Sequence, residues 1–220
     1  MLAIDKLENT KHLLKKHYED YDIISSVSCV LEDIMDENTI IINIGTDRVI
    51  FDVIAPYIGT CLRNKRCSIP IYGTISNPIH AKNLKEQLHK IKIKHPYSKI
   101  IAIDACAGDG MIGDIIIENN PRVGKDLPPV GDYSIKIVTN IITDPLCILN
   151  HYSDSIRLND IMKMGKVIGK SILKVVNNKK LNNREEFDRK INELNQIIQD
   201  EKAPTDFRLK ALGARLMSYP

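Results

Sequence analysis

Short apolar runs, rich in β-branched residues, recur along the chain as far as residue 142. TIIINI, KIIAID and IKIVTNII are almost continuously apolar and do not alternate with polar positions. Strands that are buried on both faces of a parallel sheet have this pattern. The runs therefore predict strands over residues 39–44, 69–72, 99–103, 114–117 and 135–142.

Stretches with helical spacing of apolar residues accompany these strands. They cover residues 23–36, 56–67, 78–94 and 145–176, whereas residues 1–22 are polar and expected at the periphery. Strands that alternate with helices predict an α/β protein with a mostly parallel sheet between two helical layers, a three-layer αβα architecture.

The last part of the chain differs in composition and predicts a separate organisation. NNKKLNNR, residues 177–184, is basic and polar, and it predicts a break in the helix. Asn183 would then cap a second helix over residues 184–199, before a short helix over 205–216. We therefore divide the chain into an N-terminal polar segment and helix (1–38), an αβα domain (39–170) and a basic helical C-terminal extension (171–220).

The long segment over residues 119–134 has two interpretations. It contains prolines and glycines and almost no apolar pattern. A loop of this length in a compact domain is often functional, but a surface connection stiffened by proline fits equally well.

Composition and charge narrow the class of protein. A net charge of +3 is too small to predict nucleic-acid binding, and no run approaches the length of a membrane span. The cysteines are odd in number and contain no CxxC, which is typical of reduced thiols in a cytosolic protein. We expect a cytoplasmic protein that binds neither nucleic acid nor membrane.

Two nucleotide-binding motifs occur in the wrong context. The GxGxxG of residues 108–113 leads into a strand and not a helix, so no helix N-terminus is available for a pyrophosphate. GKVIGKS, residues 165–171, is one residue short of a P-loop and lies in a helical pattern. Neither predicts a nucleotide site.

Asp52 and Asp104 follow two predicted strands and are the candidate catalytic residues. Ligands of open parallel sheets bind beyond the carboxyl ends of strands, so the two carboxylates would converge if their strands are neighbours. Asp52 could instead cap the next helix. Pro56 favours a free Asp52 carboxylate over a capping one, because a proline at the first helical position would make Ala55 the cap. Asp104 could equally be a structural acid bonded to backbone amides.

Two close carboxylates can share a proton and activate water, or they can hold a divalent metal if an imidazole is near. His80 is the best-placed histidine for this, although a helix-end histidine often bonds only to backbone. We expect no cofactor, with a divalent metal on Asp52 and Asp104 as the alternative. Cys106 could be a nucleophile, but its apolar surroundings favour a packing role.

Several motifs in the same order resemble the YyaC-type sporulation proteins. They are IGTDR (44–48), IYGTISNPIHAKNL (71–84), IAIDAC (101–106), VGKDLPPVGDYSI (123–135), VTN (138–140) and MKMG. The resemblance implies a fold similar to the germination protease of spores and the hydrogenase-maturation endopeptidases, a phosphorylase/hydrolase-like αβα architecture.

The same resemblance implies a function and a set of site residues. It implies a sporulation-associated endopeptidase, a hydrolase whose Asp52 and Asp104 cleave a protein substrate such as a spore protein, in the cytoplasm and the forespore in particular. Residues in the matching motifs would border the site: Asp47, Arg48, Thr74 and His80.

The chain also departs from the family pattern. Phe51 stands where the family has a small glycine, and the histidine that completes a metal site in the hydrogenase-maturation relatives has no counterpart. The alternative function is therefore a catalytically inactive, peptidase-like protein that acts as a binding or scaffolding factor in sporulation.

Overall fold

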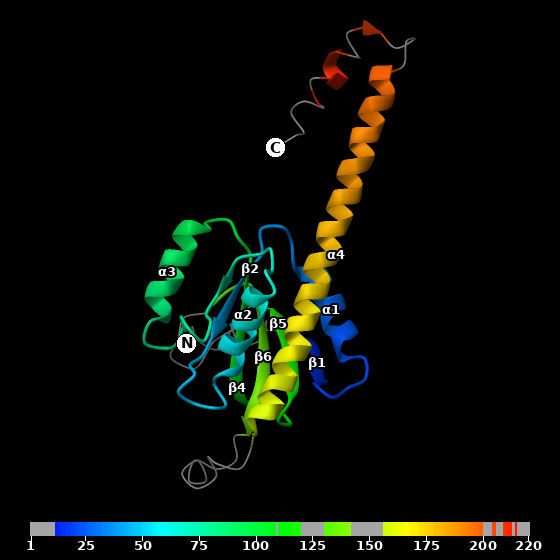
Figure 1. Ribbon diagram of the computed structural model, residues 1–220. Helices are drawn as coiled ribbons and strands as arrows, with labels where there is room; N and C mark the ends of the chain where they lie inside the picture. Colours follow the sequence, from blue (N-terminus) through cyan, green and yellow to red (C-terminus); the bar gives the residue numbers. More distant parts are fainter. Residues whose placement is uncertain are drawn as a thin grey trace, which may run out of the picture. The chain divides into compact units, whose positions relative to one another are not determined.

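The apolar runs form a six-stranded sheet in the order β1-β5-β6-β4-β2-β3 (Figure 1). The strands β6, β4, β2 and β3 pair in parallel, whereas β5 pairs antiparallel with β6 and β1 antiparallel with β5. The strand bounds are His12–His17 for β1, Ile40–Ile44 for β2, Ile71–Tyr72 for β3, Ile100–Gly108 for β4, Asp114–Asn119 for β5 and Tyr133–Ile141 for β6.

A computed structural model describes residues 12–108, 110–119, 130–141 and 156–199, together with 204–205, 209–212 and 214. The chain divides into two units, Met1–Val175 and Val176–Pro220. The sheet lies entirely in the first unit. Most of the predicted loop over residues 119–134 lies outside the described residues. The predicted helix start at residue 145 lies wholly outside them.

Helices cover both faces of the sheet, which gives the three-layer αβα architecture (Figure 1). The α3 helix lies on one face, and α1, α2 and the first part of α4 lie on the other. The α1–α4 contact is marked by Ser28, whose hydroxyl donates to the Ser171 carbonyl oxygen at 3.4 Å. The helix bounds are Ile23–Ile34 for α1, Ile54–Asn64 for α2, Leu84–Lys94 for α3 and Leu158–Gln199 for α4.

The continuous apolar runs are explained by this sandwich. In β2, the side chains of Ile40, Ile42 and Ile44 pack in one cluster with Leu84 and Leu88 of α3. Successive strand residues point to opposite faces, so the residues between them face the other helical layer. Both faces of the central strands are therefore buried, as the sequence predicts.

The order of the strands reverses direction between β2 and β4. From β2 the chain passes through α2 to β3 on one side, and then through α3 to β4 on the other side. The helices that follow β2 and β3 thus leave the sheet toward opposite faces, a switch point at which open α/β sheets bind ligands.

Strand β1 is not predicted by the sequence analysis. Its sequence, HLLKKH, pairs with β5 from His12↔Glu118 to His17↔Asp114. It lies at the edge of the sheet, where charged side chains are typical because they discourage pairing with a further strand. The polar segment therefore extends the sheet.

The predicted break at residues 177–184 is wrong. A single helix, α4, runs through this segment, and Asn183 lies within it and not at the start of a second helix. Asparagine and lysine cost a helix only a few tenths of a kcal/mol each, which neighbouring helix-forming residues can offset. None of the helices in the described part of the chain is long and apolar enough to cross a membrane.

Two helix starts also differ from prediction. Helix α2 begins at Ile54 with Val53 as its cap, so Pro56 is the third residue and Ala55 is not the cap. Proline is accepted there because the first four N–H groups of a helix have no partner within it. Helix α3 begins at Leu84, which leaves His80 in the preceding turn.

Candidate active site

Asp104 lies in the middle of β4, which continues to Gly108, so the prediction that Asp104 follows this strand is wrong. Its Cα pairs with Ile44, the last residue of β2, and with Lys136 of β6. Burial, and after it the negative charge of Asp52, raise the pKa of the Asp104 carboxyl from 3.8 to about 7. The charge of Lys136 and the N–H of Ala105 lower the pKa of Asp104, but by less than burial and Asp52 raise it. Asp104 is therefore a carboxyl that keeps its proton near neutral pH.

Asp52 reaches the same region from the turn between β2 and α2. Its Oδ2 accepts a hydrogen bond from the backbone N–H of Thr46 at 2.8 Å. Burial raises the pKa of Asp52, while this N–H and the charge of nearby His80 lower it. The N-cap of α2 is Val53, and the hydrogen bond that the Asp52 side chain makes within the described part of the chain goes to Thr46. The carboxylate thus closes its own turn and does not cap the helix.

Gly45 allows this turn to form. Its φ is +151°, and a Cβ at this position would lie 2.2 Å from the Asp52 carbonyl oxygen. Side chains other than that of glycine are strained in this conformation and would collide with the backbone of the turn. Gly45 therefore lets the chain fold back so that Asp52 lies at the end of β2.

The two carboxyl groups form a pair with unequal proton affinities. The charge on Asp52 is one of the causes of the raised pKa of Asp104, so the two groups are close and Asp52 ionises first. Two carboxylates that share a site cannot both ionise without cost, and one keeps the proton. The pair holds one base, Asp52, and one acid, Asp104.

The four residues expected to border the site lie in two turns. Asp47 and Arg48 are exposed in the turn before Asp52, where the Arg48 N–H donates to Thr46 Oγ1 at 3.3 Å. Within the described ranges, no ion pair joins Asp47 to Arg48. His80 follows β3, and its N–H donates to Asn83 Oδ1 at 2.8 Å. Its effect on the pKa of Asp52 shows that it lies near that carboxylate.

Thr74 is buried in the turn that follows β3. Its N–H and carbonyl oxygen exchange hydrogen bonds with Asn77, each 3.1 Å long. Thr74 lines a cavity along β3, and its hydrogen bonds within the described part of the chain go to Ser76 and Asn77 and not to either aspartate. The structure brings Asp52, Asp104 and His80 together and leaves Thr74 at a neighbouring place.

Sequence reasoning missed the charged residues beside Asp104. Lys136 pairs with Asp104 across β4 and β6, and its ammonium forms an ion pair with the buried carboxylate of Glu118. The thiol of Cys106 lies two residues beyond Asp104, and burial, followed by the Asp104 charge, raises its pKa to about 11. The signal was available, because Lys136 interrupts an otherwise apolar run in a buried strand.

A metal site finds little support in these positions. Among the residues that the structure describes, no group of three or more histidine, cysteine, aspartate or glutamate side chains is arranged to hold a metal ion. Two carboxyls and one histidine at this end of the sheet offer acid–base chemistry from the chain itself.

Comparisons with known proteins agree with the motifs. A family model described as "Protein of unknown function (DUF1256)" matches residues 15–171. The chain is also similar to "Uncharacterized protein YyaC" of Bacillus subtilis (strain 168), with 32% identity over 141 residues. That alignment covers 60% of this chain and 67% of the relative. The resemblance to YyaC-type proteins is confirmed, while the relation to peptidases stays a prediction. The chain belongs to the DUF1256 family.

Proposed function

We propose that this protein is an endopeptidase in which Asp52 and Asp104 hydrolyse a peptide bond of a protein substrate. One observation supports this most: the pKa of Asp104 is raised to about 7 by burial and by the charge of Asp52. A base and an acid at the carboxyl end of a parallel sheet, at a switch point, are the arrangement that water activation needs.

In the proposed reaction, the Asp52 carboxylate accepts a proton from a water molecule as the water oxygen attacks the peptide carbonyl carbon. Asp104 donates its proton to the carbonyl oxygen, which stabilises the tetrahedral intermediate. Collapse of the intermediate breaks the C–N bond: the amine leaves with the proton from Asp52, and a hydroxyl of the intermediate returns its proton to Asp104 as the carboxylic acid forms. Acid and base roles of this kind contribute about 10²–10⁴-fold each to a rate.

The substrate and the setting belong to the same proposal. The family resemblance supports a spore protein as the substrate. It also supports the cytoplasm of a sporulating cell, including the forespore, as the compartment in which the protein acts.

The test compares single Asp52→Asn and Asp104→Asn variants with the unaltered protein. Purified proteins are incubated with spore proteins, and the fragments are followed by mass spectrometry. Each variant should lose cleavage by about 10²-fold or more, because each removes one proton transfer. Asp33→Asn, at an exposed position on α1, is the matched control and should cleave normally. Unchanged cleavage in both site variants would remove the role assigned to the pair.

A binding or scaffolding role is the second candidate, and the length of α4 favours it. This helix continues into the second unit, where the Phe187 side chain is 40% exposed. An apolar side chain on an extended helix is suited to contact a partner protein. A partner that is captured equally by Asp52→Asn and by the unaltered protein, without any cleavage, would favour this second role.

A further inference from the structure

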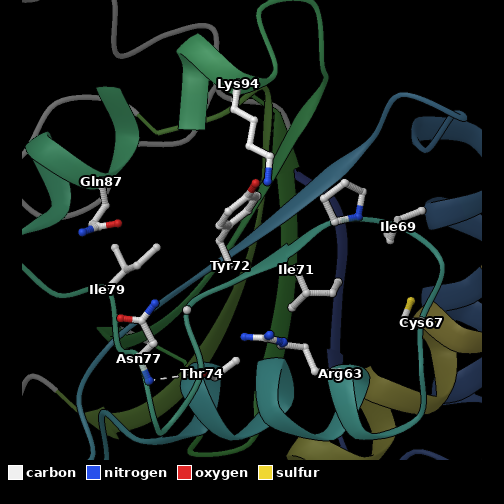
Figure 2. Close-up of a pocket in the computed structure, with 12 residues that line it drawn as sticks. Arg63, Cys67, Ile69, Ile71, Tyr72, Thr74, Asn77, Ile79, Gln87 and Lys94 are labelled. Atoms are coloured by element: carbon white, nitrogen blue, oxygen red, sulfur yellow. Dashed lines mark hydrogen bonds between the residues drawn. The ribbon is translucent and has the colours of Figure 1, made fainter. Parts of the chain in front are cut away.

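The edge strand β3 borders a cavity of about 430 Å³ (Figure 2). Residues 69–74 line it along the whole strand and its flanks, so the cavity is a groove that follows the strand. Strand β2 separates the groove from β4, the strand that carries Asp104.

The backbone of β3 has unused hydrogen-bonding groups on the groove side. The Ile41 N–H of β2 donates to the Pro70 carbonyl oxygen at 3.0 Å, and the register is Ile41↔Ile71. In a parallel pair, alternate residues direct their backbone groups to the neighbouring strand. Pro70 and Tyr72 therefore face β2, and the N–H and carbonyl of Ile71 point to the open edge.

Two basic side chains reach the groove from opposite sides of β3 (Figure 2). Arg63 comes from the last turn of α2, beside Ile71, and Lys94 from the end of α3, beside Tyr72. Within the described part of the chain, neither forms an ion pair, and no aspartate or glutamate lines the groove. The groove is consequently cationic, with one positive charge above the sheet and one below it.

We infer that this groove binds an extended peptide segment that carries two adjacent acidic residues and adds a strand to β3. Backbone groups of the peptide pair with Ile71. Successive side chains of a strand point to opposite faces, so neighbouring acidic residues reach Arg63 and Lys94 at the same time. Two acidic residues separated by one residue would point to the same face, so only one of the two basic side chains, Arg63 or Lys94, could pair with them.

The groove leads toward the aspartate pair. Beyond Tyr72 the chain passes through the Thr74–Asn77 turn to Ile79, which bridges to Ile44 at the end of β2. The next residue, His80, lies near Asp52. A segment bound along β3 would therefore extend toward the site of hydrolysis; this link, unlike the docking itself, rests on the proposed function.

The test measures binding and needs no turnover. The probe is a capped, fluorescein-labelled Thr-Val-Glu-Glu-Val-Thr peptide, and anisotropy gives its Kd with the Asp104→Asn protein, which removes the proposed acid. Replacing Arg63→Gln together with Lys94→Gln should weaken binding by about fivefold or more. The double variant Lys65→Gln with Lys92→Gln, exposed lysines outside the groove, removes the same charge and should bind normally.

The peptide itself supplies the other controls. A Gln-Gln peptide and one with its acids separated by a threonine should both bind more weakly. A proline in place of the second valine should also weaken binding if backbone pairing contributes. Free glutamate at equal concentration should not compete, because it cannot add a strand.

Three results would overturn the inference: equal affinity for the Glu-Glu and Gln-Gln peptides, the same loss of affinity in both double variants, or unchanged affinity in the Arg63→Gln, Lys94→Gln variant. These outcomes are separate from those of the proposed function. Peptide binding without any cleavage by the unaltered protein would contradict only the peptidase. Cleavage that is unchanged in the Arg63, Lys94 variant, together with unchanged binding, would contradict only the docking groove.

Discussion

Replacing Asp104 by asparagine should make the protein more stable at neutral pH. In the folded state, the pKa of Asp104 is raised from 3.8 to about 7. The folded protein therefore binds more protons than the unfolded chain between about pH 4 and 7, and the free energy of unfolding falls as the pH rises through this window. Asparagine cannot ionise and avoids this loss.

The pKa values give the size of the effect. At about 1.4 kcal/mol per pKa unit, the change from 3.8 to about 7 corresponds to a loss on the order of 4 kcal/mol above pH 7. The difference in stability between Asp104→Asn and the unaltered protein should be small at pH 4.5 and should grow toward that value by pH 8. Part of it comes from burial and would remain in an Asp52→Asn background, since burial is the larger cause.

Urea unfolding followed by circular dichroism, at several pH values between 4.5 and 8, measures this difference. Asp33→Asn, at an exposed position, should give curves that run parallel to those of the unaltered protein. A stability difference for Asp104→Asn that does not change with pH would show that Asp104 is not held protonated, and the acid role would lose its basis.

Two further predictions concern packing and thiol chemistry. A Cβ at Gly165 would lie 2.7 Å from the Tyr57 ring, so Gly165→Ala should cost about 1–3 kcal/mol in thermal unfolding. At Gly169, one turn later, a Cβ meets nothing within 4 Å, so alanine should instead stabilise α4 by about 0.5–1 kcal/mol. Equal changes in stability for Gly165→Ala and Gly169→Ala would contradict the close contact between Gly165 of α4 and Tyr57 of α2. Burial raises the pKa of the Cys106 thiol to about 11, so an alkylating reagent at pH 8 should modify exposed Cys29 well before Cys106. Peptide mass mapping measures the labelling of each cysteine, and equal labelling of Cys29 and Cys106 would contradict the raised pKa of the Cys106 thiol.

The central strands could be predicted because burial on both faces leaves a strong signal. TIIINI and IKIVTNII have no polar face, and this pattern fixes them as inner strands of a covered sheet. The strand HLLKKH gave no such signal, because an edge strand has one open side and charged residues suit it. Its pairing with β5 depends on residues far along the chain, which local pattern cannot show.

The aspartate pair was found for a reason that is partly wrong. The two strands concerned, β2 and β4, are neighbours, as the topology predicted, but Asp104 lies within β4 and does not follow it. The argument from Pro56 failed, because a proline in the first turn need not be the first helical residue. What keeps Asp52 off the helix is its bond to Thr46, and a bond between a side chain and a distant backbone N–H leaves no trace in residue spacing.

Pairing of β1 with β5 has a consequence for how the chain is made. During synthesis, His12–His17 leaves the ribosome roughly 100 residues before Asp114–Asn119, and β1 cannot complete its hydrogen bonds until then. The inner parallel strands follow a similar order, since β6 is the last to arrive. The sheet is therefore completed late in synthesis. Until then HLLKKH is unpaired and exposed to water, and its positive charges oppose aggregation.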